Sequence, residues 1–304
     1  MKDFTLDMYR VLIERLTGAG YSFQRLEDYV EEPMERVVII RHDVDRNPEK
    51  SLIMAQLEAK YGIESSYYFR SVSHSWNIDI VKKISDLGHE IGYHYENLSN
   101  QAKKLRMRNN ELKTIDRTFK KFLQNTMEKN ESSSVSESQN FESAFKSLDR
   151  ELRSKADRLF EESINAFQYE LTEMRKIVSI KTIAMHGSPL VPIDNRFLWL
   201  RYDYRDYGIK IEPYFDLNFE KMLYFTDAGR SWIDSRANLR DRVDNSLSHR
   251  FRKTEEIIKA VEDKKLPDQI MINIHPEHWT DNDLDWWKIW GVRKIKNLIK
   301  RAIY

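Results

Sequence analysis

The chain has no cysteine, which excludes disulfide bonds and any metal site built from thiolates. It also has no excess of charge of either sign, because 50 lysine and arginine residues are matched by 49 aspartate and glutamate residues. Proteins that bind nucleic acids usually carry a basic excess, so we expect no nucleic-acid partner.

Long apolar runs are missing as well. No stretch of about 18 uncharged apolar residues occurs, so we expect no transmembrane helix. The sequence begins MKDFTLDMYRVLIERL, which is charged throughout and lacks the apolar core of a secretory signal. These absences predict a cytoplasmic protein. A chain of 304 residues can bury the core of one large α/β domain, and we treat residues 1–304 as a single domain.

Short apolar runs alternate with amphipathic segments along most of the chain. Periodic apolar positions predict helices over residues 4–16, 48–62, 77–88 and 254–264. The runs that predict strands cover residues 37–40, 65–70, 89–94, 181–187, 208–215, 221–230 and 271–279. A strand, a polar tip and a helix that recur about seven times predict an α/β fold, a closed or nearly closed (β/α) barrel.

One connection is longer than a single crossover helix needs. Residues 112–127 and 141–177 place apolar side chains at helical spacing, and a polar, serine-rich stretch separates them. This pattern predicts an inserted helical hairpin over residues 100–178, with a mobile loop between two long helices. The hairpin can pack on the side of the barrel, cover the site as a lid, or form a homodimer contact.

The C-terminal residues 285–304 alternate basic and apolar side chains, as an amphipathic helix does. Such a helix either packs on the barrel or makes weak contact with an anionic membrane surface.

Polar residues end several of the predicted strands: Asp43, Asp45, His94, His186, Asp227 and His275. The active site of a (β/α) barrel lies at this end of its strands. Asp43 and Asp45 are two positions apart, so they face the same way, and their repulsion raises one pKa unless a cation is present. A divalent metal bound by Asp45 would leave Asp43 as a general base toward a metal-bound water. Alternatively, the two aspartates cap a helix or pair with Arg41 and Arg46.

Three motifs together carry a resemblance. RHDVD at residues 41–45, GHEIGYH at 88–94 and the strand that ends in His275 resemble the polysaccharide deacetylase family, carbohydrate esterase family four. The resemblance covers residues 37–98 strongly and 181–280 weakly. It implies a distorted (β/α) barrel of about seven strands and a metal-dependent hydrolase that removes an N-acetyl or similar acyl group from a sugar.

The resemblance also implies roles for single residues. Asp43 matches the catalytic base, Asp45 and His94 match metal ligands, and His275 matches the general acid that protonates the leaving amine. His89 lies five positions before His94, an odd spacing that puts the two histidines on opposite faces of a strand. We therefore expect His94 to point into the site and His89 to be structural or exposed.

The chain departs from the family at Leu98, where a second histidine ligand is usual. Catalytic zinc sites generally have three protein ligands, so we expect a third one from elsewhere. The first candidate is His186, followed by His74 and Glu96, and a site without a third protein ligand is the remaining alternative. Histidine and carboxylate ligands favour zinc as the one divalent metal, although iron, cobalt or nickel would also fit. The Arg-x-Pro-Tyr motif of the family is absent, so substrate contacts can differ.

Four further residues are candidates for substrate binding. Asp227 and Arg230 either form a pair that orients the base, bind an anionic group of the substrate through Arg230, or hold a loop together. Tyr93 and Trp279 either stack on a sugar ring or belong to the core. We expect His278 and His249 at the surface.

Three functions follow from these patterns. The leading one is deacylation of an acylated sugar or of a sugar-containing biosynthetic intermediate, within carbohydrate metabolism. The second is hydrolysis of a C–N bond in a non-sugar amide or cyclic amide. The third is a non-catalytic barrel that binds sugar or serves as a scaffold.

Overall fold

The computed structural model describes residues 2–127, 141–188, 190–232 and 251–303. The serine-rich stretch 128–140 and His249 lie outside these described residues. The chain divides into two compact units. One consists of Met1–His94, Ile177–Ala184 and Lys210–Tyr304, and the other of Tyr95–Lys176 and Met185–Ile209.

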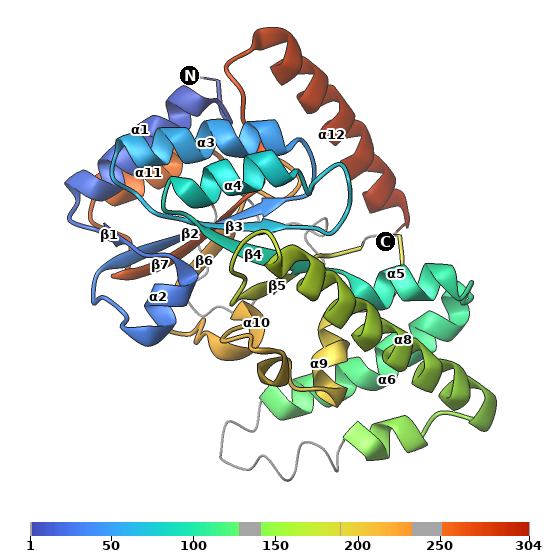
Figure 1. The fold of residues 1–304 in the computed structure, drawn as a ribbon. Coiled ribbons are helices and arrows are strands. Elements are labelled where there is room, and N and C mark those ends of the chain that lie inside the picture. The colour runs from blue at the N-terminus through green and yellow to red at the C-terminus, as the bar shows by residue number, and fades with distance from the viewer. Residues whose placement is uncertain (1, 128–140, 189, 233–250, 304) are drawn as a thin grey trace. The chain divides into compact units, whose positions relative to one another are not determined.

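A parallel sheet of seven strands organises the fold (Figure 1). Six strands follow the order β5-β4-β3-β2-β7-β6, and β1 pairs with the beginning of β2. Their bounds are β1 Ser22–Phe23, β2 Val37–Val44, β3 Ser66–Phe69, β4 Glu90–Tyr95, β5 Ile183–Met185, β6 Leu223–Thr226 and β7 Gln269–Ile274. The α/β class and the parallel pairing are therefore confirmed.

The predicted distorted (β/α) barrel of about seven strands is confirmed in part, but its closure is wrong, because the sheet curls into an open half-barrel. β5 and β6 stand at the two ends of the strand order in the described part of the chain. The predicted strand over residues 208–215 is also wrong. Its only described pairing is an isolated bridge between Thr182 and Ile211. Helix α10, Pro213–Asp216, then begins, and the Glu212 side chain caps it by accepting from Tyr214 N–H. Proline at the first helical position favours this helix over continued strand.

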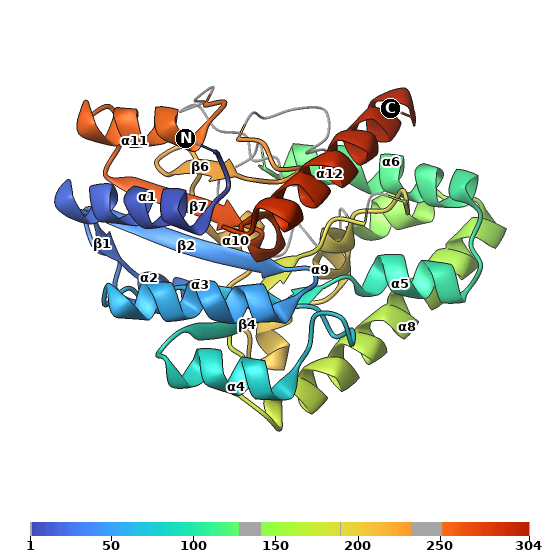
Figure 2. The same cartoon turned by 90° about the horizontal axis from the view of Figure 1, so that it is seen from above.

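Helices cover one face of the sheet in the first unit. They are α1 Leu6–Gly18, α3 Pro48–Lys60, α4 Ile78–Asp86 and α11 Thr254–Glu262. In Figure 2, α11, α1, α3 and α4 succeed one another across this face. All four confirm predicted helices, and the side chains of Thr5 and Asn77 cap α1 and α4 by accepting from Met8 and Ile80 N–H.

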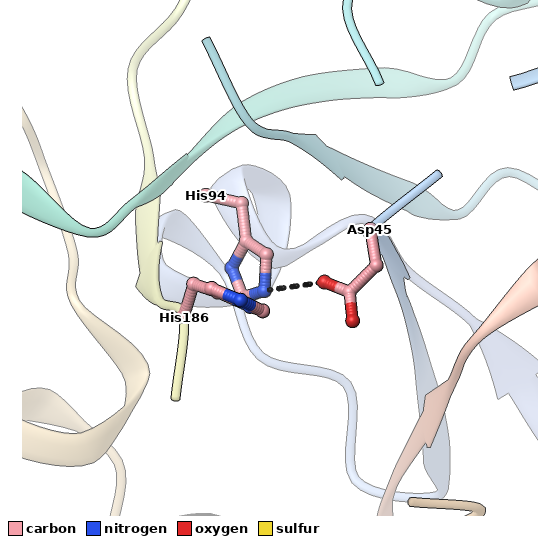
Figure 3. A group of neighbouring side chains, drawn as sticks. All are labelled: Asp45, His94 and His186. Carbon is pink, nitrogen blue, oxygen red and sulfur yellow. Dashed lines mark ion pairs between the residues drawn. The ribbon is translucent and has the colours of Figure 1, made fainter. Parts of the chain in front are cut away.

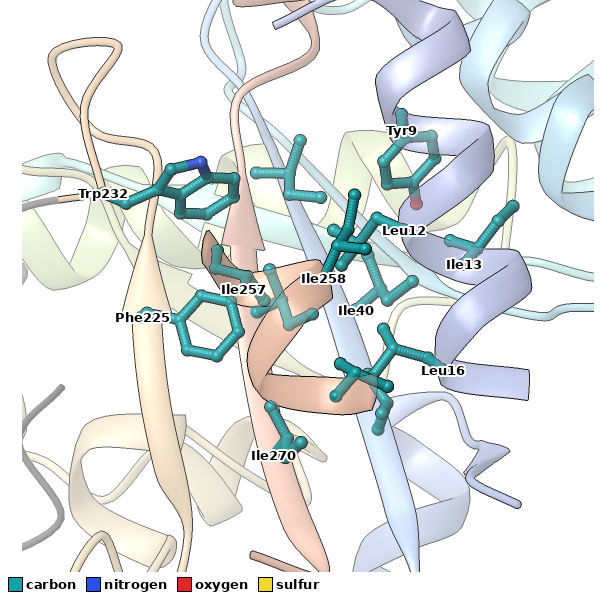
Figure 4. Close-up of a cluster of buried hydrophobic side chains, with 14 of the residues drawn as sticks. Tyr9, Leu12, Ile13, Leu16, Ile40, Phe225, Trp232, Ile257, Ile258 and Ile270 are labelled. Atoms are coloured by element: carbon teal, nitrogen blue, oxygen red, sulfur yellow. The ribbon is translucent and has the colours of Figure 1, made fainter. Parts of the chain in front are cut away.

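The main hydrophobic core lies between these helices and the sheet (Figure 4). α1 and α11 contribute Leu12, Leu16 and Ile257, which pack with Ile40 of β2 and Ile270 of β7. A smaller core on the other face contains Ile39, Tyr68 and Met271. Successive strand residues thus alternate between the two faces, as a pleated strand requires. That alternation also decides which polar side chains point into the half-barrel.

The smaller unit is mainly helical. It contains α5 Asn97–Lys104, α6 Asn109–Met127, a short helix over residues 141–146, and α8 Arg150–Arg175. Residues 141–177 were predicted as one helix, but the helix is interrupted before α8. There the Asp149 side chain caps α8 by accepting from Leu152 N–H. Stacked phenylalanine rings such as Phe119 and Phe141, 5.1 Å apart, join the helices. Short elements complete the unit: η1 Asn195–Phe197, α9 Leu198–Arg201 and η2 Tyr204–Tyr207.

The remaining elements belong to the first unit. They are α2 Leu26–Glu31, η3 Pro276–His278 and the C-terminal helix α12 Asp283–Ile303. The predicted helix over residues 285–304 is confirmed as secondary structure. Among the described residues, none of the helices has the length and apolar character needed to cross a membrane.

Candidate metal centre and acid–base pair

Asp43 lies at the carboxyl end of β2, the central strand of the first unit. It is fully buried, and its Oδ2 accepts from Arg41 Nη2 at 2.8 Å and from Asn273 Nδ2 at 2.9 Å. Arg41 and Asn273 precede Asp43 and His275 by two positions, so strand alternation turns all four side chains to the same face. Arg41 and Asn273 were not predicted as site residues, although this spacing could have found them.

These partners keep Asp43 ionised. Burial opposes the charge on Asp43, but the positive charges of Arg41, His94 and His275 and the hydrogen bond from Asn273 outweigh it, so the pKa lies below its ordinary value. Arg41 thus pairs with Asp43, one of the predicted alternatives. The pairing leaves Asp43 able to accept a proton at neutral pH.

His94 is the second-to-last residue of β4, and one hydrogen bond defines which of its ring nitrogens donates. Its Nδ1 lies 2.9 Å from the carbonyl oxygen of Ala184, and only an N–H can bond to a carbonyl, so Nδ1 donates. With Nδ1 as the donor, Nε2 is the nitrogen that can bind a metal once it has lost its proton. This atom lies 3.6 Å from Asp45 Oδ1 and 3.9 Å from Asp43 Oδ2, and Figure 3 shows His94 and Asp45 turned toward one another.

A second cluster joins His275 to Asp227. His275 follows β7, and its backbone N–H and its Nδ1 both bond to Asp227 Oδ1, at 2.9 and 2.7 Å. Burial disfavours a charged imidazole, but the bond to Asp227 and the charges of Asp227, Asp45 and Asp43 raise the pKa of His275 to about 10. His275 is therefore a proton donor at neutral pH. Asp227 therefore orients this candidate acid, a contact that none of the roles predicted for Asp227 included.

The prediction that His278 lies at the surface is wrong. His278 is fully buried, its ring stacks on His275 at 5.2 Å, and its Nδ1 lies 3.5 Å from Asp227 Oδ2. Burial lowers the pKa of His278 to about 3, so it stays neutral beside a charged His275. The histidine three positions after His275 was misjudged because the short helix η3 turns it inward.

Two groups of side chains in the first unit could hold a metal ion: Asp45 with His94, and Asp227 with His275 and His278. Both oxygens of Asp227, the carboxylate of the second group, already accept hydrogen bonds. Asp227 Oδ1 accepts from His275, and Oδ2 accepts from Trp279 Nε1 at 2.7 Å. A metal there would have to displace these bonds, so Asp45 and His94 fit a metal better.

The three candidates for a further ligand occupy different places. His74 is exposed, and its Nε2 lies 3.3 Å from Arg70 Nη1. His186 and Glu96 belong to the smaller unit, where His186 Nε2 lies 3.9 Å from Glu96 Oε2 and His186 N–H donates to Tyr95 O. Leu98, at the position where the family has histidine, is fully buried in α5.

Two rings proposed to stack on a sugar lie in the core. Tyr93 and Trp279 are each only 1% exposed, so neither presents a free face to a sugar. Trp279 instead holds Asp227 through Nε1 and packs edge-on against Phe4 and Tyr9. The position of Trp279 after a strand does not distinguish a ring that stacks on a sugar from a ring that packs in the core.

Glu277 is another residue that sequence reasoning missed. It is buried, and its Oε1 lies 3.1 Å from Arg293 Nη2. Burial and the nearby charge of Asp45 raise its pKa to about 7. This carboxyl adds acid–base capacity close to the candidate metal ligand Asp45.

Comparison of the chain with protein-family models, curated proteins and solved structures gives no match.

Proposed function

We propose that the chain is a metal-dependent hydrolase that removes an N-acetyl or similar acyl group from a sugar or a sugar-containing biosynthetic intermediate. One observation carries the proposal: Asp43 near the end of β2 is held ionised, His275 after the paired strand β7 is held protonated, and His94 Nε2 lies 3.6 Å from Asp45 Oδ1. A base, an acid and metal-binding donors at one edge of a sheet are the parts that hydrolysis of an amide requires.

Asp45 and His94 would hold the metal, and we propose His186 as the third ligand. The chain itself supports this choice. Tyr95, which follows His94 directly, accepts a hydrogen bond from His186 N–H at 2.8 Å, and Ala184, which accepts from His94 Nδ1, precedes His186 by two residues. When bound, the metal would supply Lewis acidity that polarises the acyl carbonyl and lowers the pKa of water.

The proton transfers fall to two side chains. Asp43, held by Arg41 and Asn273, accepts a proton from the attacking water. His275, held by Asp227, donates a proton to the leaving amine nitrogen, which departs as a neutral amine. The opposed pKa shifts of the two groups match these roles, since one is held ionised as a base and the other protonated as an acid.

The choice of an acylated sugar rests on the motifs RHDVD and GHEIGYH and on their resemblance to polysaccharide deacetylases. The contacts of Asp43, Asp45, His94 and His275 support the roles that this resemblance assigns to them.

The test is release of acetate from N-acetylated sugars by zinc-loaded protein. Asp43→Asn and His275→Gln should each lower kcat by roughly 100-fold to 10,000-fold, the usual contribution of a general base or acid. His74→Gln, which removes the second candidate ligand, should keep full activity if His186 is the third ligand. Asp79→Asn, on the surface of α4, is the neutral control and should also keep full activity.

Each other outcome points elsewhere. If both Asp43→Asn and His275→Gln still release acetate at the wild-type rate, the proposed mechanism is wrong. Zinc bound at one equivalent without any acetate release would move the proposal to a C–N hydrolase of non-sugar amides, which hydrolysis of a panel of cyclic amides would test. Protein that binds no zinc, iron, cobalt or nickel would favour the non-catalytic barrel.

A further inference from the structure

A cavity of about 310 Å³ lies in the first unit, away from the candidate metal ligands. Its described lining comes from the N-terminal segment, the turn after β6, the start of α11 and α12, and it includes Asp3, Phe4, Arg230, Lys253, Trp286 and Trp290. None of Asp43, Asp45, His94 and His275 belongs to this described lining. The volume lies at the lower end of the range for small-molecule sites, which is about 300–1,000 Å³.

Arg230 is the feature of this cavity that needs an explanation. Its guanidinium lies 4.3 Å from the ring centre of Trp286 and 5.6 Å from that of Phe4. Nη1 donates to the carbonyl oxygen of Trp286 at 3.0 Å. Nε and Nη2 are buried and have no hydrogen-bond partner among the described residues. A buried N–H without a partner costs free energy, so two on one side chain are expensive.

The two unpaired nitrogens form one edge of the guanidinium. Nε–H and Nη2–H point in the same direction, and this edge receives the two oxygens of a carboxylate or phosphate in bidentate pairs. Burial lowers the pKa of Arg230 to about 10, so the group remains charged at neutral pH. The chain also holds Arg230 at φ +60°, a left-handed conformation that is unfavourable for a residue with a side chain.

The lining also carries the charged residues Lys2, Asp3, Lys253 and Glu255. Asp3 accepts from the backbone N–H groups of Thr254 and Phe4, at 3.1 and 2.9 Å. Lys2 pairs with Asp283 at 2.5 Å. Trp290 is 41% exposed and offers a ring face at the cavity. The guanidinium of Arg230 and the rings of Trp286 and Trp290 therefore line the same cavity.

We propose that this cavity is a binding site for a small ring compound that carries a carboxylate or phosphate group. The oxyanion would accept from Nε and Nη2 of Arg230, and the ring would pack against Trp290. The site is independent of the proposed hydrolase function, since its described lining contains no candidate metal ligand. Carboxylate and phosphate share the bidentate geometry, so the probes below distinguish them.

Isothermal titration of chelator-treated and zinc-loaded protein tests the proposal. The probes are phenyl phosphate, benzoate, inorganic phosphate and benzyl alcohol. We expect binding of phenyl phosphate or benzoate, weaker binding of inorganic phosphate, no binding of benzyl alcohol, and quenching of tryptophan fluorescence. Benzoate affinity should be equal with and without zinc. Binding that requires zinc would place the anion at the metal centre and overturn the proposal.

Variants assign the binding to Arg230. Arg230→Lys keeps the charge but removes the pair of parallel N–H groups, and Arg230→Met removes both. Each variant should therefore bind phenyl phosphate or benzoate roughly tenfold to 100-fold more weakly. Lys259→Met, an exposed cation of α11 outside the cavity lining, should change nothing. Trp290→Leu changes an exposed position that folding tolerates. It should lower the affinity for phenyl phosphate and benzoate but not the affinity for inorganic phosphate. Unchanged affinity in Arg230→Lys and Arg230→Met, or no anion binding by the wild-type chain, would contradict the proposal.

Discussion

Glu58 is the residue around which the helix-covered face of the sheet is arranged. It lies on α3, is fully buried, and its two oxygens take hydrogen bonds from the Tyr9 and Tyr67 hydroxyls. His42 Nε2 lies 2.7 Å from Oε1, and His89 Nδ1 lies 3.7 Å from Oε2. A buried carboxylate is tolerated only when partners surround it in this way. His89 is thus a structural residue, as its odd spacing from His94 indicates.

These partners predict a pH-dependent stability. Burial opposes ionisation of Glu58, but its histidine and tyrosine partners lower its pKa from 4.5 to about 2. Because the folded pKa lies below the unfolded one, the unfolded chain binds the proton more tightly. The stabilisation is complete above about pH 4.5 and is lost as pH falls toward 2. It amounts to roughly 3 kcal/mol of unfolding free energy.

Urea unfolding of the wild-type chain and of Glu58→Gln between pH 2 and 7 measures this effect. The variant should be less stable at pH 7, and the difference between the two proteins should shrink as pH falls through this window. The exposed substitution Glu49→Gln is the control and should run parallel to the wild type. A difference that stays constant with pH would contradict the assignment.

At the scale of elements, β4 depends on one glycine. Gly92 lies opposite Tyr68 of β3 in the parallel pairing, and the buried Tyr68 ring covers it. A Cβ built on Gly92 would lie 2.3 Å from Tyr68 Cε1, closer than any real contact. Glycine is therefore needed in GHEIGYH because an aromatic ring takes the place of a side chain, and β4 carries His94 two positions later.

Gly92→Ala should accordingly destabilise the fold by about 1–3 kcal/mol, the usual effect of overpacking a core. Thermal unfolding measures it. Gly291→Ala is the matched control, because nothing lies within 4 Å of its added Cβ on α12 and alanine favours helix, so this variant should be neutral or slightly more stable. Equal unfolding temperatures for Gly92→Ala and the wild type would show that Tyr68 can move aside.

The elements also show how far local patterns extend. α1, α4 and α11 follow their predicted positions closely because each has a clear apolar periodicity, and two of them have capping side chains. α3 was found instead from Pro48 at its first turn and from Gly62 just after its end. β1 and α2 were missed, since two strand residues and a six-residue helix are too short to show a period. The strand expected near Ile211 does not form, because its only described pairing is a single bridge to Thr182 rather than a continuous ladder of hydrogen bonds.

For the whole molecule, metal binding should appear as a gain in stability. A metal that binds the folded chain and not the unfolded one stabilises it by about 2.7 kcal/mol at 100 times its dissociation constant. For a chain of this size, that raises the unfolding temperature on the order of 5 °C. Calorimetry of chelator-treated protein with and without added zinc measures the shift.

His94→Ala and Asp45→Asn should abolish the shift, and His74→Gln should retain it. His186→Ala tests the third ligand separately and should reduce the shift. If zinc stabilises His94→Ala as strongly as the wild type, the metal binds elsewhere in the chain.

The sequence by itself determined the α/β class, the helices with strong periodicity, and the aspartates and histidines that follow strands. These features depend on neighbours along the chain, which a sequence displays. Only the tertiary structure decided that the sheet stays open and that Asp227 holds His275 rather than the base. It also decided that His278 is buried and that Arg230 faces a separate cavity. Those outcomes depend on which distant segments pack together, because burial and hydrogen-bond partners arise from contacts that no local pattern encodes.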